Sequence, residues 1–153
     1  MKNINELIEI IKQLRAKYNL VIPHAIKEES IMDFSVKFNK QFHIASPNEY
    51  LEFLKICDGL VENGFTIYSS FNHEENGVAH GIFELNGIWH EQDEAFKKYV
   101  YFGDGGQDLY VFDKQTEQYQ LLDRYCGDVI EIFPSFEEML AYILNRMIGY
   151  DSA

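Results

Sequence analysis

The sequence has few cysteines, few basic residues and no long apolar run, and each shortage excludes a class of protein. Its two cysteines, Cys57 and Cys126, are too few for a disulfide framework, and no Cys-x-x-Cys pair marks a zinc or redox motif. No apolar run approaches the roughly 20 residues that a membrane-spanning helix needs. No basic segment followed by an apolar one opens the chain, so we expect no secretory leader. These absences together predict a soluble, cytoplasmic protein with reduced thiols.

The shortage of basic residues gives the chain a strongly negative charge. Lysine and arginine number 13 against 25 aspartates and glutamates, and the net charge is −12 at pH 7. The basic residues are scattered and form no patch, so the chain should repel nucleic acid. The acidity can serve solubility alone. It can also suit a basic protein partner, because opposite potentials speed encounter.

Aromatic residues, in contrast, are plentiful, with 12 Phe, 10 Tyr and 1 Trp. A chain of 153 residues with this content can bury a core without metal or disulfide staples. We therefore expect residues 1–153 to form a single domain.

Two N-terminal helices are indicated by periodicity and capping residues. Apolar residues recur at helical spacing over residues 4–18. Residues 24–44 mix apolar and polar residues without a clean period. Ser46 and Glu49 have the spacing of a capping box, which predicts a second helix that stops near Gly59.

The rest of the chain reads as strands and one closing helix. β-branched and aromatic runs predict strands at residues 65–68, 100–102, 109–112, 119–122 and 129–133. We expect short strands or bends at residues 81–83 and 87–89 and an acidic turn at 90–94. Ser135 and Glu138 repeat the capping-box spacing and predict the last helix.

The order of these elements predicts the fold class. Short connections between the strands favour antiparallel hairpins over crossover helices. Helices and strands that are segregated along the chain indicate an α+β fold. We expect a central, mostly antiparallel sheet of about five to six strands, with N-terminal helices and a C-terminal helix packed around it.

The most distinctive motif is Gly-Asp-Gly-Gly-Gln-Asp at residues 103–108, between two strand-like runs. A phosphate-binding loop would need a following lysine and a helix, and neither is present. A calcium loop would need more acidic ligands than Asp104 and Asp108. The favoured interpretation is a hairpin turn whose glycines take positive φ and whose aspartates bond to their own backbone.

No motif predicts catalysis. The five histidines show no metal-ligand spacing, and the serines include no Gly-x-Ser-x-Gly elbow. Cys57 falls on the apolar face of its predicted helix, where a cysteine is usually a small core residue. We therefore expect no catalytic residue, no bound metal and no cofactor.

Acidic groups in the predicted loops are the candidate partner-binding residues, together with the single tryptophan. Tryptophan carries a large share of binding energy at interfaces, although this one could equally belong to the core. The acids could equally form a solvated face. The candidates are Glu74, Glu75, Trp89, Glu91, Asp93, Glu94, Asp104 and Asp108.

Three segments, in order, resemble the SUKH superfamily of cell-wall-assembly regulators and bacterial immunity proteins. Residues 46–54, Ser-Pro-Asn-Glu-Tyr-Leu-Glu-Phe-Leu, are similar to its "LP-x-x-Y-x-x-F-L" helix. Residues 102–108, Phe-Gly-Asp-Gly-Gly-Gln-Asp, are similar to its "F-G-D-G-G-G-G-D" turn. Residues 135–140, Ser-Phe-Glu-Glu-Met-Leu, are similar to its closing "S-F-x-E-F-L" helix.

This resemblance implies an α+β fold without shared catalytic residues. Bacterial members of the superfamily bind and neutralise cognate toxins, often nucleases, and an acidic inhibitor suits a basic nuclease. The resemblance thus predicts a non-catalytic, antitoxin-like immunity protein with a basic toxin as its partner. Two alternatives stay open: a regulatory scaffold, and a small-ligand or metal-binding protein that uses Asp104 and Asp108.

Overall fold

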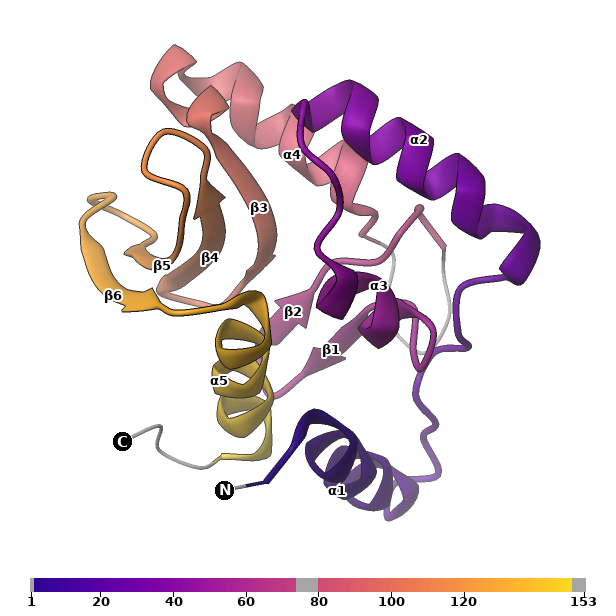
Figure 1. The fold of residues 1–153 in the computed structure, drawn as a ribbon. Coiled ribbons are helices and arrows are strands. Elements are labelled where there is room, and N and C mark those ends of the chain that lie inside the picture. Colours follow the sequence, from indigo (N-terminus) through magenta and orange to yellow (C-terminus); the bar gives the residue numbers. More distant parts are fainter. Residues whose placement is uncertain (1, 74–79, 150–153) are drawn as a thin grey trace.

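A computed structural model describes residues 2–73 and 80–149 and has an α+β architecture (Figure 1). A six-stranded sheet is surrounded by five α-helices and two short 3-10 helices among these residues. In chain order the elements are α1 (Ile4–Ala16), η1 (Glu28–Ser30), α2 (Ile31–Phe42), α3 (Asn48–Leu54), β1 (Leu60–Glu62), β2 (Phe65–Ile67), α4 (Ile82–Gln92), η2 (Glu94–Lys98), β3 (Tyr99–Asp104), β4 (Asp108–Asp113), β5 (Gln118–Asp123), β6 (Val129–Phe133) and α5 (Phe136–Ile148).

The sheet has the simplest possible order, β1-β2-β3-β4-β5-β6, and every neighbouring pair is antiparallel. Between β2 and β3 the chain leaves the sheet to form α4 and η2. This arrangement confirms the predicted α+β fold and its antiparallel sheet. β1 and β6 are the two edges.

Side chains alternate between the two faces of the sheet, and each face packs against different helices. On one face, which we call the α5 face, the rings of Phe102 and Tyr119 lie 5.1 and 5.8 Å from the ring of Phe136 in α5. On the other, the α4 face, Tyr101 stacks on Trp89 of α4 with ring centroids 5.2 Å apart. The sheet therefore separates the main aromatic core from a second packing layer.

Helix α2 forms in the stretch that showed no clean period. Phe34, Phe38 and Phe42 recur every four residues and are fully buried. Phe38 stacks near Phe102 of the sheet, at 6.2 Å between centroids. Met32 is exposed on the outer side of the helix, with 75% of its surface accessible. Exposed apolar residues of this kind hide the helical period in the sequence.

Helix α4 replaces the short strands and the acidic turn that were predicted at residues 81–94, and that prediction was wrong. The cause is Asn86, a polar residue at a core position of the helix. Its side-chain amide donates to Tyr101 O at 2.8 Å, and its Oδ1 accepts from Tyr101 N–H at 2.7 Å. A fully paired amide can occupy the core at little cost, but it interrupts the apolar pattern of the sequence.

The two predicted capping boxes differ in outcome. The Oγ of Ser135 accepts from Glu138 N–H at 3.2 Å, so this serine caps α5 as predicted. Helix α3 begins one residue later than predicted, with Pro47 at its N-cap and no side-chain cap. Ser46 Oγ instead lies 3.4 Å from Pro47 O, so its predicted capping role was wrong.

Candidate functional site

The motif at residues 103–108 forms the predicted hairpin turn between β3 and β4. None of its glycines has positive φ, so that part of the prediction was wrong. Glycine is required here for close approach: a Cβ on Gly103 would lie 2.4 Å from Thr66 O in β2. A Cβ on Gly105 would lie 2.7 Å from the ring of Phe65. The motif therefore seats the turn against β2 rather than cradling a ligand.

The first aspartate of the turn, Asp104, is held by a buried tyrosine. Tyr68 donates its hydroxyl hydrogen to Asp104 Oδ2 at 2.6 Å, and Asp104 Oδ1 lies 3.8 Å from Nη1 of Arg124. Burial raises the pKa of Tyr68, and the charge of Asp104 raises it further. The tyrosine therefore stays protonated and acts as a permanent donor to this carboxylate.

The second aspartate, Asp108, has an equivalent arrangement on the other side of the turn. Tyr110 donates to its Oδ2 at 2.8 Å, and Arg146 of α5 lies 3.9 Å away. Burial raises the pKa of Tyr110, with the hydrogen bond to Asp108 as the second cause. Neither aspartate side chain makes the predicted hydrogen bond to the described backbone nearby, so that part of the prediction was wrong; their carboxylates accept from Tyr68 and Tyr110 instead.

These pairings bear on the metal-binding alternative. Each aspartate uses one oxygen for a hydroxyl and lies near an arginine, which competes electrostatically with a cation. Among residues 2–73 and 80–149, no three His, Cys, Asp or Glu side chains lie close enough together to hold a metal ion. The turn therefore packs against β2 through its glycines and is linked to α5 by the ion pair of Asp108 with Arg146.

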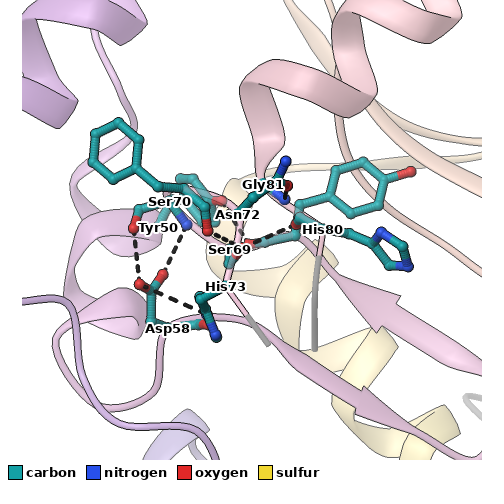
Figure 2. A network of polar contacts seen from close by, with 10 residues as sticks. Tyr50, Asp58, Ser69, Ser70, Asn72, His73, His80 and Gly81 are labelled. Atoms are coloured by element: carbon teal, nitrogen blue, oxygen red, sulfur yellow. Dashed lines mark hydrogen bonds and ion pairs between the residues drawn. The ribbon is translucent and has the colours of Figure 1, made fainter. Parts of the chain in front are cut away.

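A second polar cluster surrounds Asp58, where the chain passes from α3 to β1 (Figure 2). Its carboxylate accepts from the Ser70 backbone N–H at 2.7 Å and from the Ser70 hydroxyl at 2.8 Å. His73 Nε2 lies 2.7 Å from the backbone oxygen of Asp58. Asn72 Oδ1 accepts from Gly81 N–H at 2.7 Å.

This cluster contains serine, histidine and aspartate but lacks the order of a catalytic triad. In a triad the histidine stands between the other two, whereas here Asp58 stands between Ser70 and His73 (Figure 2). The single hydroxyl hydrogen of Ser69 has two main-chain acceptors within reach, Phe71 O at 2.8 Å and His80 O at 3.0 Å. The contacts of the cluster therefore hold residues 69–73 and 80–81 in place and do not form a nucleophile–base pair.

A groove of about 480 Å³ runs over the α4 face, and we call it the α4 groove. Trp89 and Phe96 form one side, and Arg124 and Tyr125 of the β5–β6 turn form the other. The guanidinium of Arg124 lies 5.6 Å from the Trp89 ring centroid. Trp89 also donates its Nε1–H to the Tyr68 hydroxyl at 3.4 Å. The groove is thus joined through Tyr68 to the carboxylate of Asp104.

The predicted partner-binding residues are only partly brought together. Trp89 is half-buried in the wall of the α4 groove, and Glu91, Asp93 and Glu94 are exposed where α4 leads into η2. Asp93 caps η2 by accepting from Ala95 N–H at 2.9 Å. Arg124 also lines the groove. This arginine was not among the residues predicted from the sequence, because no pattern in the residues around it indicates that it lies beside Trp89.

The remaining candidates lie elsewhere. Asp104 reaches the groove only through Tyr68 and Arg124, and Asp108 faces α5. Glu74 and Glu75 lie outside the described residues. The surface that carries the candidate residues is therefore the end of α4, the start of η2 and the groove beside them.

The antiparallel sheet, the glycine turn seated against β2 and the α4 groove, which is lined by aromatic and charged side chains, define an α+β protein. The model of the SMI1 / KNR4 family (SUKH-1) matches residues 25–142, and the chain belongs to this family. The match begins before α2 and ends within α5, so it includes the whole sheet. The chain matches no curated protein. None of the helices in the described ranges is long and apolar enough to cross a membrane.

Proposed function

We propose that this protein is a non-catalytic immunity protein that binds and neutralises a basic toxin, such as a nuclease. The observation that carries the proposal is the position of three exposed acids, Glu91, Asp93 and Glu94, beside a groove walled by Trp89. Tryptophan is enriched among the residues that carry most of the binding energy at interfaces. Membership of the SMI1 / KNR4 family supports the protein-binding class.

Electrostatics favour a basic partner. A net charge of −12 attracts cationic surfaces over distances of about one Debye length, roughly 8–10 Å at ordinary salt. Glu94 lines a neighbouring hollow together with Lys97, Lys98 and Lys114, and Lys98 also lines the α4 groove, so the acidic surface is confined to the exposed end of α4 and the start of η2. The partner's basic surface should therefore face the exposed acids at the end of α4, beside the groove.

Neutralisation by such a complex requires no chemistry from this chain. A nuclease attracts nucleic acid with a basic surface, and an acidic protein bound there blocks the same surface. The polar clusters at Asp58 and at Asp104 have structural partners, which agrees with a binding role.

The proposal is tested by binding to a basic nuclease domain encoded beside the gene for this protein. Isothermal titration at 50 and 300 mM salt should give a one-to-one complex that weakens as salt rises. The Glu91→Lys/Glu94→Lys variant should bind at least about tenfold more weakly, because two attractive charges become repulsive.

The matched control is Glu9→Lys/Glu28→Lys, which makes the same change in net charge far from the groove. Each variant also removes one surface ion pair with a lysine three residues away, that of Glu94 with Lys97 at 2.9 Å and that of Glu9 with Lys12 at 3.9 Å. Equal weakening by both variants would mean that only net charge matters and would contradict a site at α4. Binding without inhibition of the nuclease would favour the regulatory scaffold.

A further inference from the structure

The two edges of the sheet differ in how their backbones are covered. At β1, Arg15 of α1 donates from Nη1 to Val61 O at 3.0 Å and also contacts Glu62. At β6, no side chain in the described part of the chain hydrogen-bonds to the backbone of residues 129–133. An open edge leaves main-chain groups that can pair with another strand. The backbone of β1 is therefore partly covered by the Arg15 side chain, whereas the backbone of β6 has no such cover among the described residues.

The open edge is also unusually apolar. Val129, Ile130 and Ile132 are 48, 56 and 52% exposed, although apolar side chains of this size are normally buried. Ile132 lies opposite Gln120 and shares the α4 face, whereas Glu131 lies opposite Leu121 on the α5 face. A register shift at Leu121/Leu122 leaves Ile130 as a bulge, which limits the edge to pairing with a short segment.

The stretch of chain that forms this edge and the first turns of α5 is acidic. Residues 125–145 contain no lysine or arginine, and their four acids are Asp128, Glu131, Glu137 and Glu138. All four are exposed. A strand that pairs with β6 therefore gains by placing a cation opposite Glu131, since opposite charges across a strand pair stabilise it.

A second copy of this chain is a poor occupant. Antiparallel pairing centred on β6 would place Glu131 opposite Glu131, and like charges directly opposite are destabilising. Two chains that each carry a charge of −12 also repel.

We propose that β6 accepts a short extended segment of a basic partner protein, which adds as a seventh antiparallel strand. Apolar side chains of that segment lie over Ile132, and a lysine or arginine lies opposite Glu131. The proposal rests on the proposed function, because it takes the partner to be basic. It extends that function by assigning the main-chain contact and the sequence pattern that β6 recognises.

The test uses the full chain and a capped heptapeptide of alternating lysine and valine. Amide hydrogen exchange followed by NMR should show slowed exchange at residues 129–133 on peptide addition. The same peptide with alternate N-methylated amides should not bind, because it cannot complete the ladder. Absence of protection at β6 with 5 mM peptide, or protection confined to another element, would overturn the proposal.

Reversing the charge of Glu131 is a second test of the proposal. Glu131→Lys should weaken binding of the lysine peptide about tenfold and strengthen binding of the matching glutamate peptide. For both peptides, Glu131→Gln should give an affinity between those of wild type and Glu131→Lys. Glu9→Lys should leave the affinity for both peptides unchanged. Equal affinity of wild type and Glu131→Lys for the lysine peptide would contradict the pairing. A dimer in sedimentation that Ile132→Lys dissolves would show that a second copy occupies the edge.

The two proposals fail separately. If the nuclease binds and Glu131→Lys leaves its affinity unchanged, the β6 inference is wrong and the proposed function stands. If the peptide protects β6 but no basic nuclease binds, the edge site stands and the proposed function is wrong.

Discussion

The hydroxyl of Tyr68 donates to Asp104 at 2.6 Å and accepts from the indole of Trp89 at 3.4 Å. One buried side chain therefore joins the glycine turn to the α4 groove. Tyr68 is fully buried, so its hydroxyl has no water to replace a lost partner. Removal of the Tyr68 hydroxyl should consequently lower the free energy of unfolding by more than removal of an exposed hydroxyl would.

Tyr68→Phe should lower the free energy of unfolding by about 1.5–3 kcal/mol, the range for a buried hydrogen bond to a charged group. Urea denaturation followed by circular dichroism measures this change. Tyr125→Phe is the control, because its hydroxyl donates to Gly106 O at 3.1 Å but the side chain is 80% exposed. We expect a loss of less than about 0.5 kcal/mol there, and equal losses would contradict the role given to Tyr68.

Two glycines of the turn at residues 103–108 should respond differently to substitution by alanine. Gly103→Ala places a Cβ against the Thr66 carbonyl of β2 and should destabilise the fold by about 1–3 kcal/mol. Gly106→Ala meets no atom within 4 Å and should be nearly neutral. Thermal melting of the two variants compares them directly. Two neutral variants would show that the close approach of β2 and β3 is not required.

Ser135 caps α5 whereas Ser46 does not cap α3, and alanine variants of the two serines test this difference. Ser135→Ala removes the N-cap of α5 and should cost about 1 kcal/mol. Ser46→Ala removes no cap from α3 and should cost much less. Chemical denaturation of both variants distinguishes them, and a larger loss at Ser46 would restore the capping box predicted from the sequence.

His90 gives a pH dependence. Burial lowers the pKa of its ring, and Lys114 and Lys97 add to this, although the hydrogen bond to Tyr99 O at 2.7 Å opposes it. The unfolded chain therefore binds more protons than the folded one below about pH 6.5, so stability falls as pH falls through that range. His90→Gln keeps a donor but does not titrate.

The stability of wild type relative to His90→Gln should accordingly decline between pH 7.5 and pH 5.5. Urea denaturation at several pH values measures this difference and cancels the carboxylates common to both proteins. A relative gain for wild type on acidification would have the opposite sign and would contradict a lowered pKa.

The parts of the fold that could be predicted are those with local signals. Strands β3 to β6 contain runs of β-branched and aromatic residues bounded by turn residues, and α5 has both its cap at Ser135 and its left-handed glycine at Gly149. Helix α4 could not be predicted, because Asn86 is made compatible with the core only by Tyr101, which lies 15 residues away. Local patterns carry no information on such pairings.

The same limit applies to the candidate site. The acidic cluster near Trp89 could be predicted because its members are close in sequence. The bond from Tyr68 to Asp104 spans 36 residues, and the groove depends on Arg124, which lies in the turn between β5 and β6 and contacts Trp89 from there. These contacts exist only once the sheet has formed.

Neutralisation of a basic nuclease by this protein is tested most directly by one titration. The activity of a basic nuclease domain encoded beside its gene is measured as purified chain is added at 100 mM salt. We expect that activity falls linearly to zero at one chain per nuclease, and that Glu91→Lys/Glu94→Lys shifts this curve to an excess of chain while Glu9→Lys/Glu28→Lys does not. Full nuclease activity in the presence of a large excess of wild-type chain would contradict it.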